Sequence, residues 1–475
     1  MAIPEGFLSQ LQVALAAVVA PGLCGCGLVR ALGLPPDAGV RLTLGLGYVA
    51  GQFVVAVLTA VWLWLGQPVP GVVLPLVAAS VGVVCLLRAR RRLSAAALPL
   101  PEREPRSLLV LLVTAVLLLL LAHEALVANG SPVRFGDEAQ IWAGKAKAFY
   151  AAPVIPLQLG LAVVEHADYP NLGPLAQVLA FASVGRVLHF ESRLPLQAFG
   201  LAVVLLLSAA TSRRAHPAVA AMILVAAAAT LPTGAWTTAG ADVALACALL
   251  ATVECLLRWF ETGQVAWWRC SAMALAAMLA TKNEGAMLAL AVAGAAGARW
   301  WLLRRVAQSP HLRWRELGWL LVPAAAVTLH AAFNRSLGLR NDLLDPALAG
   351  GRGLFARMFD QASTHGPQAL SFFARLAIDP AAHRLLPLLL LAAVAAAMVR
   401  DGRAFWRGAA AMLLAVVAAG LAGYLLVFTG THADLAWHLA TAGARTAWQV
   451  VPVAALGCAI AIAPRARANA ATRAQ

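Results

Sequence analysis

The sequence predicts an all-α, polytopic membrane protein. Hydrophobic residues make up 61% of the 475 residues and charged residues only 12%, whereas soluble domains carry about 25% charged residues. Apolar runs of roughly 20 residues, the length that a helix needs to cross the hydrocarbon core, recur along the whole chain. Helices satisfy the backbone hydrogen bonds of such runs within lipid, so they are the expected spanning element.

We expect about thirteen transmembrane helices. In chain order they cover approximately residues 8–29, 42–65, 71–87, 108–127, 194–210, 218–231, 241–257, 266–280, 286–303, 317–333, 385–398, 409–428 and 450–462.

Basic loops give these spans a predicted orientation. The loop between the third and fourth spans carries six arginines, at positions 88, 90–92, 103 and 106. The positive-inside rule places that loop in the cytoplasm. Counting outward from it predicts an N-terminus outside, a C-terminus in the cytoplasm, and periplasmic loops at 129–193, 334–383 and 429–449.

The net charge of +15 fits the same interpretation. Most arginines stand in short clusters between spans, so we expect a lipid bilayer and no nucleic acid as the partner.

The seven cysteines lie in or beside apolar runs, which is typical of small buried side chains and not of a disulfide framework or a zinc site.

The fourth span leads directly into a polar stretch. Asp137, Ile141 and Lys145 follow at helical spacing, which predicts an amphipathic interfacial helix that starts at Asp137 and Glu138. Negative charge is favoured at a helix start, so both acids fit a purely structural role. Their position at the mouth of a span fits a catalytic role equally well.

Three further segments on the predicted outer face are polar. His166-Ala-Asp-Tyr-Pro170 indicates a turn into a second interfacial helix. It either ends in a capping Asp168 or brings His166 and Asp168 to face Asp137. Lys282-Asn-Glu284 forms a hairpin tip between two spans. It is either solvated or holds a cation against a phosphate.

The last outer segment predicts a helix with Asp434, His438, Thr441 and Arg445 on one face. It is either an amphipathic interfacial helix, anchored by Trp437, or an anion site. The loop at 334–383 carries no pattern that assigns it a structure, and His365 and Asp345 remain unassigned.

Four motifs together resemble a known family. Gly136-Asp-Glu-Ala-Gln-Ile-Trp142, His166-Ala-Asp-Tyr-Pro170, Lys282-Asn-Glu-Gly285 and Leu435-Ala-Trp-His438 with Arg445 are similar to patterns of bacterial integral-membrane glycosyltransferases of the GT-C superfamily. The nearest branch is that of the protein O-mannosyltransferase-like and aminoarabinose-transferase-like enzymes. The resemblance covers about residues 134–450.

The resemblance implies a GT-C-like bundle, a bacterial inner-membrane location and a polyprenyl-phosphate sugar donor. It implies that Asp137 is catalytic, with Glu138 as its partner. The residues expected to bind donor or substrate are Arg134, Lys145, His166, Asp168, Tyr169, Lys282, Asn283, Glu284, Trp437, His438 and Arg445. The typical family plan has one span before the catalytic loop, whereas three precede it here. Residues 1–106 are therefore expected to be an addition to a catalytic module at 107–475.

We therefore expect transfer of a sugar to a hydroxyl of a cell-envelope glycan, lipid or protein on the periplasmic face. Asp137 would act as general base with inversion at the sugar, while Lys282, Arg445 and Arg134 would stabilise the leaving phosphate. These cations need no metal, but a divalent cation becomes possible if Asp137, Glu138 and Asp168 converge. The alternatives are a transporter or flippase for a lipid-linked or anionic precursor, with Asp242 and Glu254 as its nearest intramembrane charges, and a structural subunit.

Overall fold

The computed structural model describes residues 5–95, 107–133, 136–152, 154–230, 240–341, 344–347, 351–379 and 386–463. Every regular element within these ranges is a helix, which confirms the predicted fold class. Arg134, one of the predicted donor-binding residues, lies outside the described residues.

The longer helices follow the apolar runs. They are α2 (Ala20–Ala31), α3 (Val40–Trp64), α4 (Val73–Ala95), α5 (Leu108–Ala128), α8 (Leu172–Val184), α9 (Leu194–Arg214), α10 (Pro217–Ala229), α11 (Asp242–Thr262), α12 (Val265–Leu279), α13 (Glu284–Arg304), α15 (Leu321–Ser336), α17 (His365–Ile378), α19 (Leu386–Asp401), α20 (Ala409–Thr429) and α23 (Val451–Ile462). The short ones are α1 (Glu5–Val13), α6 (Gly144–Ala151), α7 (Leu157–Leu161), α14 (Trp314–Leu317), α16 (Leu354–Gln361), α21 (Leu435–His438) and α22 (Ala444–Trp448).

Each of the thirteen predicted spans lies in a helical stretch; the first runs through α1, η1 (Ala14–Val19) and α2. Within the described residues, nine helices are long and apolar enough to cross a membrane, and the bent pair Leu435–Trp448 and Val451–Ile462 makes a tenth if it counts as one span. The other predicted spans fall on α10, α12 and α19, which are 13, 15 and 16 residues long. All three are shorter than the roughly 20 residues that a helix needs to cross the hydrocarbon core.

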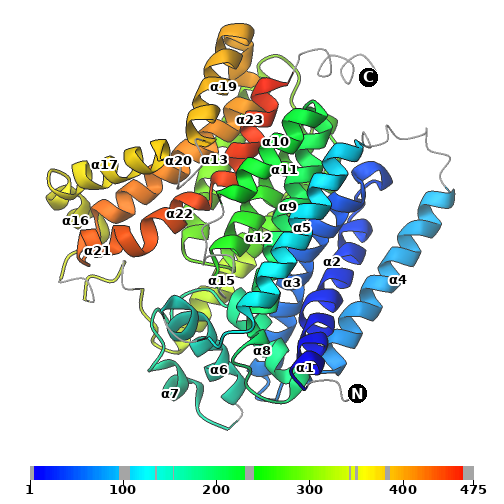
Figure 1. The fold of residues 1–475 in the computed structure, drawn as a ribbon, viewed down its shortest axis with the longest axis vertical. Coiled ribbons are helices and arrows are strands. Elements are labelled where there is room, and N and C mark those ends of the chain that lie inside the picture. The colour runs from blue at the N-terminus through cyan, green and yellow to red at the C-terminus, as the bar shows by residue number, and fades with distance from the viewer. Residues whose placement is uncertain are drawn as a thin grey trace.

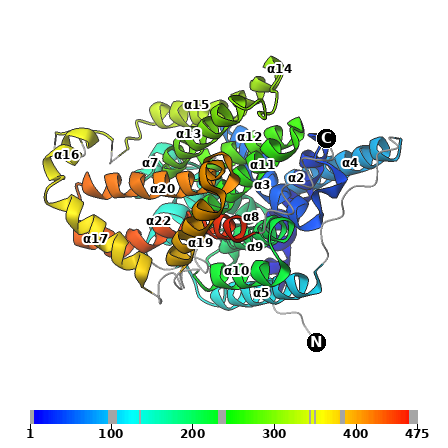
Figure 2. The same cartoon turned by 90° about the horizontal axis from the view of Figure 1, so that it is seen from above.

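Helix α11 forms the centre of the bundle. Its apolar stretch is buried throughout, and it packs against α9, α12, α13 and α23. The N-terminal helices share this core, because α3 packs against α8, α9, α11 and α12. Seen from above, α4, α14 with α15, and α16 with α17 lie at the periphery (Figure 2).

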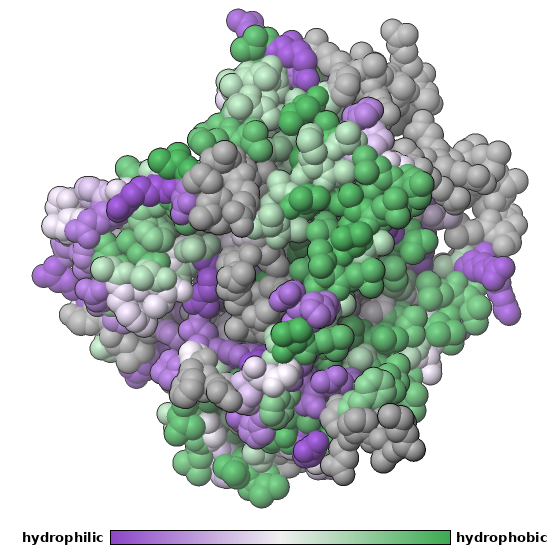
Figure 3. Space-filling model, in the orientation of Figure 1, coloured by the Kyte–Doolittle hydropathy of each residue, from purple (hydrophilic) through white to green (hydrophobic). Residues whose placement is uncertain are grey.

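The two ends of the bundle differ. The short helices α6 and α7, together with α8 and the start of α1, gather at one end, while the last turn of α23 lies towards the other (Figure 1). Apolar side chains such as Leu119, Leu120 and Met222 are exposed on the intervening flank, where α5 and α10 present a broad hydrophobic surface (Figure 3). A broad exposed apolar flank on helices of this length is the kind of surface that a bilayer covers.

The two predicted interfacial helices are packed more deeply than expected. In the segment after Asp137, the side chains of Trp142, Lys145 and Phe149 are all buried. The helix after Pro170 is α8, and it packs against α3 and α6 as an almost wholly buried apolar element. The prediction of a second interfacial helix is therefore wrong, because the 172–184 segment has no polar face to present to solvent.

Helices α2 and α3 meet through glycines. A Cβ atom on Gly51 would lie 1.8 Å from the carbonyl oxygen of Pro21, and one on Gly25 would lie 1.8 Å from the carbonyl oxygen of Gly47. Backbone lies against backbone here, as is common where membrane helices approach closely. Neither contact leaves room for a methyl group.

Gly51→Ala should therefore lower the thermal stability of the purified protein, because overpacking a tight contact costs about 1–3 kcal/mol. Gly294→Ala is the matched control, since a Cβ there meets no atom within 4 Å and alanine favours helix over glycine. Equal melting temperatures for the Gly51→Ala variant and the control would contradict the close packing of α2 on α3.

Candidate active site

The candidate site begins where the chain leaves α5. Gly136 has φ +68°, a conformation that glycine adopts without strain. Asp137 follows it and immediately precedes η3 (Glu138–Ala143), a π-helical turn that runs into α6. Such turns are frequent at functional sites. The Asp137 side chain remains 45% exposed, so a substrate can reach its carboxylate.

Glu138 faces away from that opening and binds Arg193. The guanidinium donates to both carboxylate oxygens, through Nη2 to Oε2 at 2.9 Å and through Nε to Oε1. Arg193 also donates to the carbonyls of Ala128, at 2.8 Å, and Ser131, at 2.5 Å. Both side chains are only 7% exposed. Because removing one partner of a buried ion pair costs about 3–5 kcal/mol, this contact fixes the segment that carries Asp137 against the end of α5.

Asp137 is joined to the distant C-terminal segment by Arg445. Arg445 Nη2 donates to Asp137 Oδ2 at 2.7 Å, and Arg445 Nη1 lies 3.6 Å from Asp242 Oδ2. Arg445 is the second residue of α22. A second π-helical turn, η7 (Leu439–Gly443), directly precedes that helix. One guanidinium therefore links the loop after α5, the start of α11 and the start of α22.

Asp242 extends the contact to the hairpin tip between α12 and α13. Its carboxylate accepts from Lys282 Nζ at 3.0 Å and from Gln449 Nε2 at 2.6 Å. Lys282 Nζ also lies 2.8 Å from Glu284 Oε1. The charged network thus consists of three carboxylates and two cations: Asp137, Asp242, Glu284, Lys282 and Arg445.

The surroundings of Lys282 favour its protonated ammonium form. Burial acts against the ammonium, but the neighbouring carboxylates of Asp242 and Glu284 outweigh it and raise the pKa of Lys282 well above its ordinary value. These carboxylates favour the charged form of Lys282, which is joined to Asp137 through Asp242 and Arg445.

Beside this network, the neutral amide side chains of three asparagines surround Asp168. Asp168 Oδ2 accepts from Asn283 Nδ2 at 2.8 Å and from Asn341 Nδ2 at 2.7 Å, and the Asp168 carbonyl accepts from Asn334 Nδ2 at 2.8 Å. Asn283 follows Lys282 in sequence, so the predicted Lys-Asn-Glu tip contacts both Asp242 and Asp168. Asp168 is only 4% exposed, and its partners lock the loop at 166–170 onto the hairpin tip.

Lys145 supports that loop from beneath. Its ammonium donates to the carbonyl oxygen of Ala167 at 2.6 Å and to that of Tyr169, and it lies near the rings of Phe149 and Phe333. The side chain is fully buried. Burial lowers the pKa of Lys145 to about 7, against the opposing pull of Asp168. A neutral amine has two N–H donors, enough for the two carbonyls.

Aromatic rings belong to the segments that carry Asp137 and Asp168. His166, which has a positive φ of 49°, stacks on Tyr169 with ring centroids 5.0 Å apart, and Tyr169 lies 5.8 Å from Trp142. His438 lies further along, with Nδ1 2.9 Å from Thr431 Oγ1 and its ring against Phe428. Trp437 is 61% exposed, as expected of an interfacial anchor.

The structure thus brings together most of the predicted side chains, but in two layers. Asp137, Lys282, Glu284 and Arg445 form the charged network, and Lys145, Asp168 and Asn283 form the layer that holds the 166–170 loop. Asp137 binds Arg445, Glu138 binds Arg193, and Asp168 accepts from Asn283. Among the described residues, no group of three or more His, Cys, Asp or Glu side chains is arranged to hold a metal ion.

Sequence reasoning missed four residues that complete the site. Asp242 appeared only as an acidic residue at the start of a span. Tyr424 lies in a predicted span and Gln449 ends the predicted outer loop, and the two are hydrogen-bonded to each other. Arg193 stands 55 positions from Glu138. Asp242 was the one sequence feature that could have pointed to these contacts. A carboxylate at the start of an apolar span needs a cation beside it once the span is buried.

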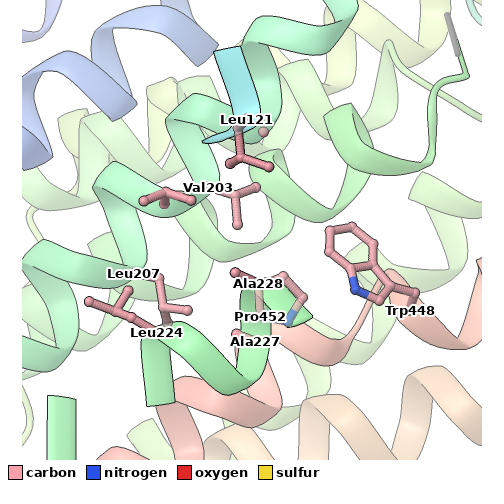
Figure 4. Close-up of a pocket in the computed structure, with 10 residues that line it drawn as sticks. Leu121, Val203, Leu207, Leu224, Ala227, Ala228, Trp448 and Pro452 are labelled. Carbon is pink, nitrogen blue, oxygen red and sulfur yellow. The ribbon is translucent and has the colours of Figure 1, made fainter. Parts of the chain in front are cut away.

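A small apolar cavity lies behind the network. It is enclosed by side chains of α5, α9, α10 and α23, including Leu121, Val203 and Leu224, with Trp448 at one side (Figure 4). Its volume of about 20 Å³ holds roughly one water. The cavity is therefore a packing feature next to the network and has no room for a sugar or a lipid chain.

Fold and site together define a polytopic helical membrane protein whose charged network joins the loop after α5, the starts of α11 and α13, and α22. Residues 170–330, about a third of the chain, match the family model described as dolichyl-phosphate-mannose-protein mannosyltransferase. The match supports a GT-C-like membrane glycosyltransferase. No curated protein and no solved structure matches the chain. The matched region contains Asp242, Lys282 and Glu284 but neither Asp137 nor Arg445.

The pKa of Lys145 gives a test of the layer beneath the site. Lysine titrates near 10.4 in an unfolded chain, so between about pH 7 and 10 the unfolded state binds a proton that the folded state has lost. The free energy of unfolding should therefore rise with pH in that window, by up to about 1.4 kcal/mol per unit.

Lys145→Met should remove this slope, while Lys147→Met, a change of a partly exposed lysine in the same helix, should keep it. Denaturant unfolding of the detergent-solubilised protein at several pH values measures the difference. Parallel curves for wild type and Lys145→Met would show that Lys145 stays charged when buried.

Proposed function

We propose that the chain transfers a sugar from a polyprenyl-phosphate donor to a hydroxyl of a cell-envelope glycan, lipid or protein, on the periplasmic face of the bacterial inner membrane. The observation that carries the proposal is the pairing of Asp137 with Arg445, linked through Asp242 to Lys282. It puts an accessible carboxylate and two cations at one opening. Glycosyl transfer from a lipid phosphate needs that combination.

In this mechanism Asp137 accepts the proton of the acceptor hydroxyl as its oxygen bonds to the anomeric carbon. The bond between that carbon and the phosphate oxygen breaks, and the lipid phosphate departs with the electron pair. Lys282 and Arg445 stabilise the negative charge that develops on it. Direct attack by the acceptor on the face opposite the phosphate inverts the anomeric centre.

Arg445 has to change partner for this to occur. A phosphate offers the guanidinium a bidentate anion, so donor binding draws Arg445 from Asp137 and leaves the Asp137 carboxylate free to act as a base. Asp242, which is only 3% exposed, keeps Lys282 and Arg445 in place. In this scheme Glu138 is a positioning residue, acting through Arg193.

The remaining predicted residues take supporting roles. We assign the faces of Tyr169 and His166 to a sugar ring, since aromatic rings offer an apolar surface with polar edges. We assign Trp437, whose side chain is 61% exposed, and the neighbouring His438 to contact with the lipid part of the donor. In this proposal residues 1–106 remain an addition to the catalytic module at 107–475.

A transporter would hold its substrate near the bilayer midplane, at broken helices. Arg445 lies in the bent pair Leu435–Trp448 and Val451–Ile462. The three carboxylates, however, lie at helix starts: Asp137 directly precedes η3, and Asp242 and Glu284 are the first residues of α11 and α13. This position favours chemistry at the membrane surface over passage through it.

Asp137→Asn should lower transfer from a labelled polyprenyl-phosphate sugar by about 10²–10⁴-fold, because the amide cannot accept the hydroxyl proton. Donor binding should survive, since Lys282 and Arg445 are unchanged. Glu165→Gln is the matched control: it neutralises an exposed carboxylate of the same loop and should leave transfer unaltered. Wild-type transfer by Asp137→Asn would remove Asp137 from the role of base.

A further inference from the structure

A second charged cluster lies far from the candidate active site, on the same helices. Glu254 accepts from Arg214 at 2.7 Å and from Arg258 at 2.6 Å, and Arg214 also donates to Glu261 at 3.0 Å. Glu254 stands twelve residues along α11 from Asp242, a helical distance of about 18 Å. Four basic side chains, Arg213, Arg214, Arg258 and Arg299, lie near two carboxylates here, those of Glu254 and Glu261.

Arg299 is the cation without a carboxylate bound to it. Its side chain is only 9% exposed, and the guanidinium lies 4.7 Å above the ring of Phe260. Among the described residues its one polar approach is from Nη1 to Met412 Sδ at 3.9 Å, while Nε has no hydrogen-bond partner. Glu261 acts on Arg299 only at longer range and is already paired with Arg214.

A buried guanidinium in a membrane span is costly unless an anion compensates it. The nearby carboxylates are already shared among Arg213, Arg214 and Arg258, so the cluster keeps an excess of positive charge. Arginine is the side chain best suited to a phosphate, because its planar fork binds two phosphate oxygens.

The depth of Arg299 points to a lipid as the source of that phosphate. Arg299 stands five residues before the end of α13, or about 7 Å from it. The next two residues are Trp300 and Trp301, which stack with Arg304 and Arg305 at the helix end. Tryptophan and arginine at the end of a span mark the level of the headgroups.

We propose that Arg299, with the excess positive charge of the Arg213–Arg214–Arg258 cluster, binds the phosphate of an anionic phospholipid in the leaflet opposite the candidate active site. Basic pockets between transmembrane helices bind lipid phosphates in this way. The lipid phosphate supplies the hydrogen-bond acceptor that Arg299 Nε lacks. The site is independent of the glycosyl-transfer proposal, since it involves neither Asp137 nor its partners.

Native mass spectrometry of the full chain tests this directly. The detergent-solubilised protein is titrated with dioleoyl phosphatidylglycerol, and with dioleoyl phosphatidylcholine as the zwitterionic comparison. Wild type should retain phosphatidylglycerol preferentially. Arg299→Gln should weaken that binding by about tenfold, the effect of losing a charged hydrogen bond. Arg304→Gln, which alters an exposed arginine of the same helix end, should bind as wild type does.

Equal phosphatidylglycerol binding by wild type and Arg299→Gln would overturn the proposal, as would equal retention of both lipids by wild type. Arg213→Gln provides a second variant at the partly exposed edge of the cluster, where binding should fall severalfold. Wild-type binding by that variant would also contradict the proposal. An arm with inorganic phosphate distinguishes the source: displacement of phosphatidylglycerol by inorganic phosphate would overturn the assignment to a lipid.

Discussion

The contact on which the site depends is the guanidinium of Arg445, held between Asp137 and Asp242. It spans 308 positions of sequence and ties the loop after α5 to the central helix. Only arginine suits this position, because its rigid fork presents donors in two directions whereas a lysine ammonium is a single point charge. The cations hold carboxylates on three separate elements, so each element fixes the position of the others.

Two π-helical turns place the ends of this contact. Asp137 directly precedes η3, and Arg445 is the second residue of α22, which follows η7. A π-turn inserts a residue into the helical repeat and so changes the direction in which the following side chains point. Beneath them, Arg193 and Lys145 satisfy backbone carbonyls at the end of α5 and in the 166–170 loop. The charged side chains in the opening are thus mounted on segments that buried hydrogen bonds already hold.

The sequence was sufficient for the fold class, because a span is a local property of about twenty consecutive residues. It was also sufficient to single out Asp137, Lys282 and Arg445 as polar residues beside apolar runs. Their mutual contacts were not predictable, since they depend on packing between distant helices. Asp242 was missed for the same reason, and the burial of Lys145 contradicts a helical spacing that indicated an exposed face. The 334–383 segment, which showed no pattern, forms α16 and α17 in its described part.

The most direct measurement of the central claim is the affinity of the purified chain for polyprenyl phosphate, the expected leaving group, in wild type, Asp137→Asn and Arg445→Gln. If Arg445 exchanges Asp137 for a phosphate, Asp137→Asn binds polyprenyl phosphate as tightly as wild type or more tightly, because the competing carboxylate is gone. Arg445→Gln then binds it at least about tenfold more weakly, as expected for a lost charge-assisted pair. Equal affinity in wild type and Arg445→Gln, or a loss in Asp137→Asn as large as that in Arg445→Gln, would contradict it.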